Sequence, residues 1–407
     1  MFLNRSFWPD TEATAQFLAE LCEDLSGEHD ITFIAGPSHH RAQAPRRLWT
    51  RERFGTVSIV RTWGTRFPKR LLPLRVANLA TYYLLAALAA FRQQPPEIVI
   101  AETDPPLLGA VGAMLKRHWG CRFVYNVRDL YPDIARVTGA VKSRVLLGLM
   151  ERGNQLAYRW ADRIIAVGHD MAQSLIDKGI SPARVTVVPD WVDCDSIRPL
   201  ERNAFRTSFG DKFVVMYSGN LGLSQQLETV LEAAQRLRDD RRIIFVLIGD
   251  GARKRWLMER ARELNLPNVE FLPYRAKAEL AESLSAADLH LVPLSPGSAG
   301  CLVPSKTYGI LAAGRPFVAV MEDSAEVARL ARDYRVGLVS PPGDDSALAK
   351  AVLEAVDSPI ELKQMGQRAR RLACERFDRR VATRRFAAVL SEVAHMCDAG
   401  PSVRAAT

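Results

Sequence analysis

The sequence repeats one pattern along most of its length: a short apolar run is followed by a longer stretch with helical spacing of its apolar residues. In the first half the apolar runs lie at 31–35, 56–63, 97–101, 121–127, 163–167 and 185–188, and the helical stretches at 13–25, 76–91, 106–119, 142–160 and 170–178. Such alternation is typical of a parallel sheet covered by helices on both faces. The predicted fold class is therefore α/β, with a doubly wound, Rossmann-like sheet.

The pattern fails between residues 190 and 211, where polar residues and Pro199 take over, and then restarts. Further apolar runs follow at 213–217, 243–248, 269–272, 289–292 and 316–320. A chain of 407 residues is also too long for one typical core. We predict Rossmann-like domains at 1–190 and 212–378, a linker at 191–211, a helix at 379–398 that packs back on the first domain, and a flexible tail at 399–407.

Composition supports a folded protein of a reducing compartment. Hydrophobic residues make up 48% of the chain and charged residues 25%, so both halves can form cores. The six cysteines form no CxxC pair and have no partnering histidine cluster, which argues against a disulfide framework and structural zinc. A Trp-Pro-Asp turn soon follows the short apolar start, so we expect no signal peptide and a cytoplasmic location.

The net charge of +9 is concentrated in one segment. Between Arg41 and Arg75 the chain carries ten basic residues against one acid, Glu52, and the apolar stretch from Val76 to Phe91 follows directly. Basic residues beside an apolar helix indicate peripheral attachment to the anionic inner face of the plasma membrane. A helix buried against the sheet, preceded by a solvated loop, explains the same pattern. The stretch is shorter than the roughly 20 residues that span a bilayer, and no nucleic-acid motif accompanies the basic residues, so we expect no nucleic-acid partner.

The segment from Pro304 to Pro316 follows an apolar run and a loop with two glycines, and it leads into another apolar run. This order predicts a strand, a loop, a helix and a strand. Ser305, Lys306 and Thr307 then stand at the start of the helix, where free backbone N–H groups, a hydroxyl and an ammonium suit a phosphate or diphosphate. An ordinary crossover with a capped helix has the same pattern, because one Ser-Lys pair is a weak motif.

Ligands of open parallel sheets bind at the carboxyl ends of the strands. The residues that follow predicted strands at this edge are 9–14, 128–129, 168–169, 218–222, 249–251, 273–274 and 298–306. Two such edges are expected to face each other, one from each domain.

Several motifs taken together resemble glycosyltransferase family 4, of GT-B fold, over nearly the whole chain. They are VVPDWVD (187–193), YSGNLG (217–222), IGDG (248–251), VEFLP (269–273) and LAAGRP (311–316). FWPD (7–10) with ATA (13–15), and VPSK (303–306), resemble more particularly the branch that contains the L-fucosamine transferases of O-antigen and exopolysaccharide assembly. The resemblance implies two Rossmann-like domains facing across a cleft. It also implies a retaining transfer from a nucleotide-diphosphate sugar, with no metal and no other cofactor.

Residues at the motif positions and at the strand ends give three sets of candidates. The candidate catalytic residues are Asp129, Lys306 and Arg128. The candidate donor-binding residues are Gly219, Asn220, Gln225, Gly251, Arg253, Tyr274, Gly300, Ser305, Lys306, Thr307 and Arg315. The candidate acceptor-side residues are Asp10, Thr11, Glu12, Asp129 and His169.

Some candidates have a structural alternative. Arg253 could belong to a basic helical face, and Asp129 could cap the following turn. His169 could be an ordinary helix-start residue, and Tyr274 could be a core residue.

The sequence also departs from the family pattern. The positions at which the family often has an Arg and a Lys hold Asn220 and Gln225, and two positions at which it often has glutamates hold Cys301 and Gly309. Lys306 and Arg315 add cations near the same loop.

We predict a metal-independent, retaining hexosyl-type glycosyltransferase that moves a sugar, expected to come from UDP, to a lipid-linked or polysaccharide acceptor in cell-surface polysaccharide synthesis. Front-face attack is favoured, because no carboxylate nucleophile is evident. Two alternatives stay open: a non-catalytic, membrane-associated scaffold of the same fold, and a nucleotide-sugar 2-epimerase.

Overall fold

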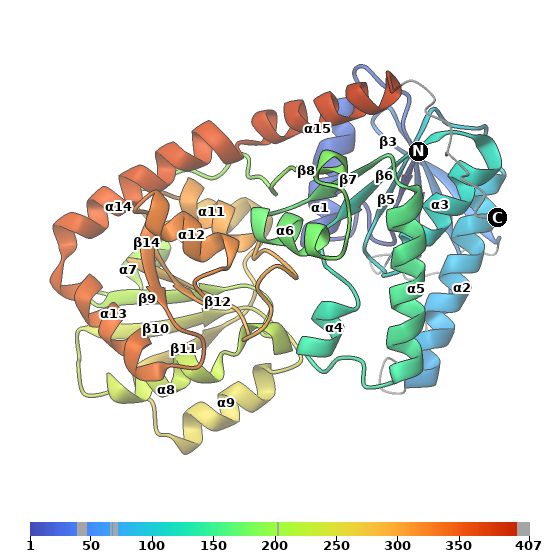
Figure 1. The fold of residues 1–407 in the computed structure, drawn as a ribbon. Coiled ribbons are helices and arrows are strands. Elements are labelled where there is room, and N and C mark those ends of the chain that lie inside the picture. The colour runs from blue at the N-terminus through green and yellow to red at the C-terminus, as the bar shows by residue number, and fades with distance from the viewer. Residues whose placement is uncertain (39–46, 66, 68–71, 202, 397–407) are drawn as a thin grey trace.

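The computed structural model describes residues 1–38, 47–65, 67, 72–201 and 203–396 (Figure 1). It contains two sheets, of eight and six strands, each with helices on its faces. Both sheets are parallel apart from one edge strand of the first. The predicted α/β class with two doubly wound sheets is confirmed.

The first sheet has the strand order β3-β4-β2-β1-β5-β6-β7-β8. Its strands are β1 (Phe2–Leu3), β2 (Thr32–Ala35), β3 (Trp49–Phe54), β4 (Val57–Thr62), β5 (Ile98–Glu102), β6 (Arg122–Val127), β7 (Arg163–Ala166) and β8 (Val185–Val187). Its helices are α1 (Ala13–Leu25), α2 (Leu72–Phe91), α3 (Leu108–Trp119), α4 (Asp133–Val137), α5 (Arg144–Trp160) and α6 (His169–Asp177). The chain direction around the sheet reverses between β1 and β5, so the loops after these two strands diverge and leave room for a ligand.

The second sheet has the order β11-β10-β9-β12-β13-β14. Its strands are β9 (Phe213–Ser218), β10 (Ile243–Ile248), β11 (Val269–Leu272), β12 (Leu289–Pro293), β13 (Phe317–Val320) and β14 (Gly337–Ser340). The helices are α7 (Ala204–Thr207), α8 (Glu228–Arg236), α9 (Lys254–Glu263), α10 (Leu280–Ser285), α11 (Lys306–Ala312), α12 (Glu326–Asp333), α13 (Asp345–Asp357), α14 (Pro359–Leu372) and α15 (Arg379–Ala394). Strand β10 is buried at every position, as its unbroken apolar sequence requires.

The last helix, α15, leaves the second sheet and crosses to the first, as the red ribbon in Figure 1 shows. Phe386, Val389 and Val393 are buried in a core that also contains Phe2 and residues of α1. The rings of Phe2 and Phe386 stack with centroids 6.4 Å apart. Apolar packing therefore holds the C-terminal helix on the N-terminal sheet.

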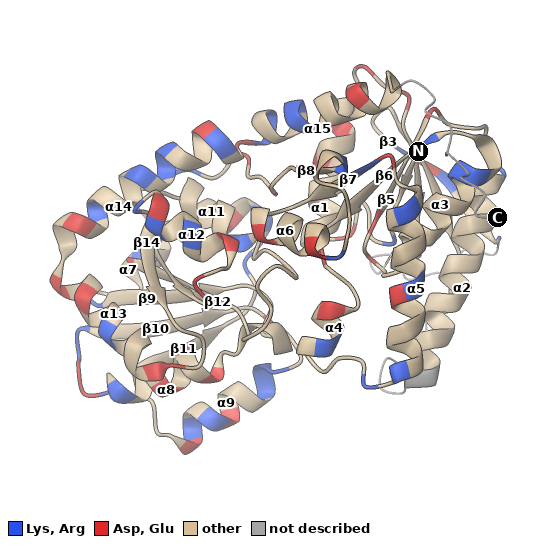
Figure 2. Cartoon of the chain, viewed as in Figure 1, with Lys and Arg blue, Asp and Glu red and all other residues tan. Residues whose placement is uncertain are grey.

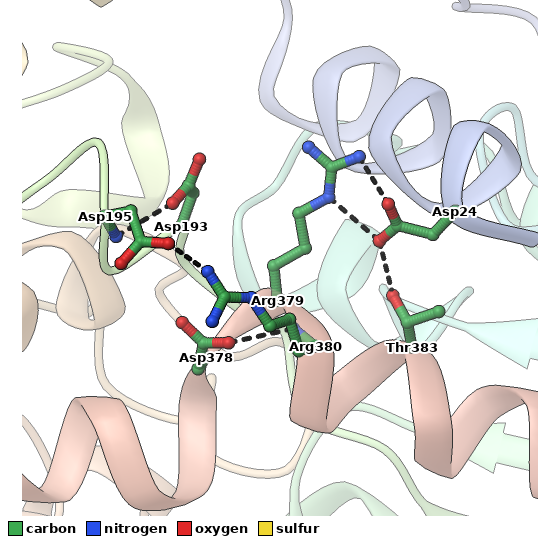
Figure 3. A pocket seen from close by; sticks show the side chains of 7 residues that line it. All are labelled: Asp24, Asp193, Asp195, Asp378, Arg379, Arg380 and Thr383. Carbon is green, nitrogen blue, oxygen red and sulfur yellow. Dashed lines mark hydrogen bonds and ion pairs between the residues drawn. The ribbon is translucent and has the colours of Figure 1, made fainter.

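Two chain segments cross where the domains join. The Val192 N–H donates to the Phe377 carbonyl, and the Arg379 N–H donates to the Val192 carbonyl, each at 2.9 Å. A hollow of about 410 Å³ lies beside this crossing (Figure 3), and its lining residues are Asp24, Asp193, Asp195, Asp378, Arg379, Arg380 and Thr383. Arg379 donates to Asp24, and Arg380 pairs with Asp195, so these charges neutralise one another. None of the predicted site residues lines this hollow.

The basic segment, predicted to be a loop, contains the strand β3. Strand β3 pairs antiparallel with β4, and within it Arg51 and Arg53 alternate with half-buried residues. Arg61 on β4 is 3% exposed and bonded to Glu52, so it is not available to an anionic surface. Five of the other basic residues predicted for membrane contact are outside the described residues: Arg41, Arg46, Arg66, Lys69 and Arg70.

Helix α2 contains the predicted apolar stretch from Val76 to Phe91. Tyr82, Leu85 and Ala86 are buried against the sheet, whereas Leu84 is 69% exposed. Of the two explanations for this apolar stretch, membrane attachment and burial against the sheet, burial accounts for the inner face of the helix. In the described part of the chain, no helix is both long enough and apolar enough to cross a membrane.

Candidate active site

The carboxyl edges of the two sheets meet where the loop after β6 contacts the loop after β12. The Leu130 N–H donates to the Cys301 carbonyl at 2.7 Å, and Asp129 forms an antiparallel bridge with Leu302. Asp129 from the first domain and Lys306 from the second thus stand on the two sides of one junction. In both domains the candidates that follow strand ends gather at these edges.

Lys306 is the first residue of α11, and its side chain turns back toward the loop after β9. Its Nζ lies 3.8 Å from the ring centroid of Tyr217, and a Cβ built on Gly219 would be 2.9 Å from the same Nζ. Gly219 has a φ of +149°, which glycine adopts without strain. Because Gly219 has no side chain, the Lys306 ammonium can approach its backbone closely. The Nζ atom is buried and has no hydrogen-bond acceptor. Burial lowers the pKa of Lys306 to about 7.

The loop after β9 is braced by its own side chains. Gln225 accepts the Gly222 N–H at 3.2 Å, and Asn220, which is exposed, accepts the Tyr217 hydroxyl at its backbone carbonyl at 2.6 Å. The loop after β10 packs against it, because a Cβ on Gly251 would lie 2.5 Å from the Asn220 Oδ1. Gln225 therefore shapes the loop that borders Lys306.

Two other donor-side candidates, Arg253 and Tyr274, are paired or exposed. Arg253 pairs with Glu228, and its guanidinium lies 4.1 Å from the ring centroid of Trp256. Tyr274, just beyond β11, is 55% exposed, so it is not a core residue.

Ser305 stands before α11 and makes no side-chain cap bond. Thr307 is fully buried, and its hydroxyl donates to the Pro304 carbonyl at 2.8 Å. The Thr307 hydroxyl is therefore directed at its own chain.

Arg315 is a correction to the predicted donor set. It follows α11, which runs back from the carboxyl edge, so Arg315 stands just before β13 at the amino edge of the sheet. Burial lowers its pKa, and Asp288, at the start of β12, opposes that shift. A helix that returns antiparallel to its strands separates its two ends, which puts Arg315 at the opposite edge from Lys306.

Gly300 also has a partner that the sequence does not indicate. Its N–H donates to the Asp170 Oδ2 at 3.1 Å, and a Cβ at this position would lie 2.3 Å from the Ser174 Oγ. The Gly300 N–H is therefore bound to the first domain in this structure and is not turned to a ligand.

On the acceptor side, Arg128 and Asp129 follow β6. Arg128 pairs with the buried Asp190, and its guanidinium lies 5.1 Å from the ring centroid of Phe17. The Asp129 N–H donates to the Thr103 Oγ1 at 3.1 Å. Burial raises the pKa of Asp129 to about 6, nearby Asp104 adds to the rise, and Arg128 opposes it.

The loop after β1 holds the other acceptor-side candidates. Asp10 is buried and accepts the Ser38 hydroxyl at 2.6 Å, whereas Thr11 is exposed. Glu12 accepts the Ser6 hydroxyl at 2.5 Å. His169 lies elsewhere, as the first residue of α6, and its backbone N–H donates to the Glu326 Oε2 at 2.8 Å. His169 is therefore an exposed residue at a helix start whose first N–H is bonded to the second domain.

Two acids at the end of β5, Glu102 and Asp104, are absent from the predicted site residues. Asp104 accepts from Arg5 and Ser6, both at 3.3 Å, and so joins the loops after β1 and β5. Glu102 is fully buried and accepts the Asn126 amide at 2.9 Å; burial raises its pKa to about 7. Acids at the carboxyl end of a strand, beside the switch point of the sheet, were the sequence signal that could have identified them.

Within the described ranges, no group of three or more His, Cys, Asp or Glu side chains is arranged to hold a metal ion. The described cysteines, Cys22, Cys121, Cys194, Cys301 and Cys374, are all free thiols.

Two family models match this chain and together span most of it. "Glycosyl transferase 4-like domain" matches residues 13–191, and "Glycosyl transferases group 1" matches residues 201–372. The boundary between the two matches lies within the predicted linker.

Among curated proteins, the chain is 28% identical over 332 residues to the probable glycosyltransferase WbjE of Pseudomonas aeruginosa, covering 79% of this chain and 82% of that protein. It is 26% identical over 372 residues to the putative colanic acid biosynthesis glycosyl transferase WcaI of Escherichia coli K12, covering 87% of this chain and 91% of that protein. Both similarities extend through both domains.

Two solved structures show the same fold. The sucrose-phosphate synthase of Thermosynechococcus elongatus superposes with a TM-score of 0.77 at 17% identity, covering 96% of this chain and 98% of that one. HepE of Anabaena, in complex with UDP, gives a TM-score of 0.70 at 16% identity, covering 96% and 99%.

Proposed function

Because the chain belongs to the family 4 glycosyltransferases of GT-B fold, we propose that it transfers a sugar from a nucleotide-diphosphate donor to a lipid-linked or polysaccharide acceptor. We further propose that the donor is a UDP-sugar and that the acceptor belongs to cell-surface polysaccharide synthesis. Solved neighbours of the same fold include a complex with UDP, and one relative is named for colanic acid biosynthesis.

The observation that carries the proposal is the Lys306 ammonium, which is buried beside Gly219 and has no acceptor. An unpaired buried cation is unfavourable unless an anion completes the site. A diphosphate between the loop after β9 and the start of α11 would supply that anion. Lys306 would then stand in for the Lys that the family often has at the position of Gln225.

The proposed reaction is retaining and needs no metal. The bond between the anomeric carbon and the diphosphate oxygen breaks, and the acceptor hydroxyl attacks the same face of the sugar. Its proton passes to the departing diphosphate, whose growing charge Lys306 stabilises. Loss of one such electrostatic contact typically costs about 10²–10³ in turnover.

On the acceptor side, we propose that Asp129 binds the attacking hydroxyl. It lies at the domain junction, and Arg128 beside it is paired with Asp190. Asp10, Glu12 and Asp104 belong to the two loops at the switch point and supply carboxylate acceptors for sugar hydroxyls.

The nucleotide proposal is tested by differential scanning fluorimetry of the wild type and Lys306→Ala with UDP, GDP, ADP and TDP. A ligand that binds only the folded protein stabilises it by about 2.7 kcal/mol at a hundredfold excess over its Kd. We expect a shift with UDP that is lost in Lys306→Ala and kept in Lys350→Ala, since Lys350 is exposed on α13. No shift with any nucleotide would favour the non-catalytic scaffold. The epimerase would be favoured if UDP shifts the melting temperature, the protein transfers no sugar, and it interconverts the free nucleotide-sugar.

We also propose that the first domain contacts an anionic membrane surface. Helix α5 exposes Val145 (84%), Leu149 (55%) and Leu156 (39%) on one face. Arg152 and Arg159 are exposed at positions that continue this face, and Figure 2 shows basic residues along α5. Apolar and basic side chains on one helix face are suited to an anionic lipid surface.

Sedimentation with vesicles tests this contact. We expect the wild type to bind phosphatidylglycerol-containing vesicles, and Val145→Asp with Leu149→Asp to reduce binding severalfold. Ile360→Asp is the control, because Ile360 is 75% exposed on α14 of the other domain. Equal loss in the control, or no binding by the wild type, would contradict the proposal.

A further inference from the structure

Helices α6 and α12 begin opposite each other at the domain junction, in the centre of Figure 1. Each helix start receives a carboxylate from the other domain. The Glu326 side chain accepts the His169 N–H at 2.8 Å, and the Asp170 side chain accepts the Glu326 N–H at 2.9 Å. The two first turns therefore cap each other, which satisfies backbone groups that a helix start leaves free.

Asp170 has a further partner on the loop between β12 and α11. The same Oδ2 atom accepts the Gly300 N–H at 3.1 Å, and the other oxygen accepts the Met171 N–H at 2.7 Å. Asp170 is 9% exposed, so its charge is compensated mainly by these three N–H groups. Two of the three belong to the second domain.

The same loop contacts the first domain at several positions before Lys306. Cys301 accepts the Leu130 N–H at 2.7 Å, and Val303 lies so near Gly168 that a Cβ there would be 2.8 Å from Val303 Cγ2. Lys306 follows three residues later, as the first residue of α11. Any shift of the loop away from α6 therefore displaces the chain that leads directly into Lys306.

We propose that Asp170 is a positioning residue for the donor: it holds residues 300–305 against the first domain and thereby sets the place of Lys306. This inference rests on the proposed function, because the group that it positions is the one assigned to the diphosphate. Domain opening breaks both inter-domain bonds of Asp170. The carboxylate therefore links closure of the two domains to the geometry of the donor loop.

The test compares Asp170→Ala, Asp170→Asn and Gly300→Ala in the full chain. Asp170→Ala removes the acceptor, Asp170→Asn keeps an amide oxygen without the charge, and Gly300→Ala places a methyl group against Ser174. Asp344→Ala is the matched control: Asp344 caps α13 by accepting the Ala347 N–H at 2.8 Å, within the second domain. Two quantities are measured: amide hydrogen exchange of the ligand-free proteins and the Kd for UDP.

In Asp170→Ala and Gly300→Ala we expect faster amide exchange in the peptides around residues 295–305. We also expect the Kd for UDP to rise by at least about tenfold, from the loss of a charged hydrogen bond. Asp170→Asn should recover part of both effects, and Asp344→Ala should match the wild type in both. Faster exchange with unchanged UDP affinity would overturn the positioning role, as would wild-type exchange in Asp170→Ala. If UDP fails to bind even the wild type, the proposed function fails, whereas the exchange data still report on the docking of the loop.

Discussion

The two sides of the candidate active site satisfy their buried charges in different ways. In the first domain, Arg128 is paired with Asp190 and Arg61 with Glu52, so folding itself provides a carboxylate for each guanidinium. In the second domain, Lys306 has a buried Nζ with no acceptor. The first arrangement is complete in the ligand-free protein, whereas the second is completed by an anion. The comparison indicates that the acceptor side is preformed. On the donor side, a bound anion would supply the charge compensation that the ligand-free protein lacks.

The largest effect is expected from removing one member of a completed pair. Asp190→Ala leaves the Arg128 guanidinium buried without its carboxylate, which should lower the free energy of unfolding by about 3–5 kcal/mol. Urea denaturation measures this change. Asp195→Ala is the control, because Asp195 pairs with Arg380 at an exposed site and should cost less than about 1 kcal/mol. Equal and small losses in both variants would mean that the buried Arg128–Asp190 pair stabilises the fold no more than an exposed pair, which would contradict the description of the first domain.

A smaller effect is expected on the donor side, in the pH dependence of UDP binding. Burial lowers the pKa of Lys306 to about 7, so the free protein loses this charge as the pH rises above 7, while bound diphosphate favours the charged form. The Kd for UDP should therefore rise with pH, approaching about tenfold per unit between pH 8 and 9. Isothermal titration calorimetry over pH 7–9 measures it.

The control for that measurement is Lys306→Arg, which stays charged throughout and should lose the slope. His290 also lies near Lys306, but burial lowers its pKa to about 4, so it does not titrate in this range. A wild-type Kd that is independent of pH would show that the Lys306 ammonium does not bind the diphosphate.

Much of the fold was predictable because strand and helix periods are local properties. The alternation of apolar runs with stretches of helical spacing predicted both sheets. The break in helical spacing before residue 379 marks the start of α15. Two missed strands have weak local signals: β3 alternates exposed arginines with half-buried residues at a sheet edge, and β14 has only four residues. Helix α13 was also missed, although its apolar residues recur at helical spacing and Asp344 caps it.

The candidate site was predictable where residues directly follow strands. Lys306, Gly219 and Asp129 lie at the expected edges, because the chain direction of a parallel sheet fixes where each strand ends. Arg315 was misplaced because its nearness to Lys306 in sequence hides a helix that returns to the other edge. Asp190 and Asp104 were missed because their partners, Arg128 and Arg5, are 62 and 99 residues away.

By itself, the sequence determined that this chain forms two parallel α/β sheets, and it determined which side chains stand at the ends of the strands. Only the tertiary structure decided which of those charges are paired. Arg128 acquires Asp190, Gly300 acquires Asp170, and Lys306 is left without an acceptor. The physical reason is that periodicity depends on neighbours along the chain, whereas the energy of a buried charge depends on whatever the fold brings within a few ångströms of it.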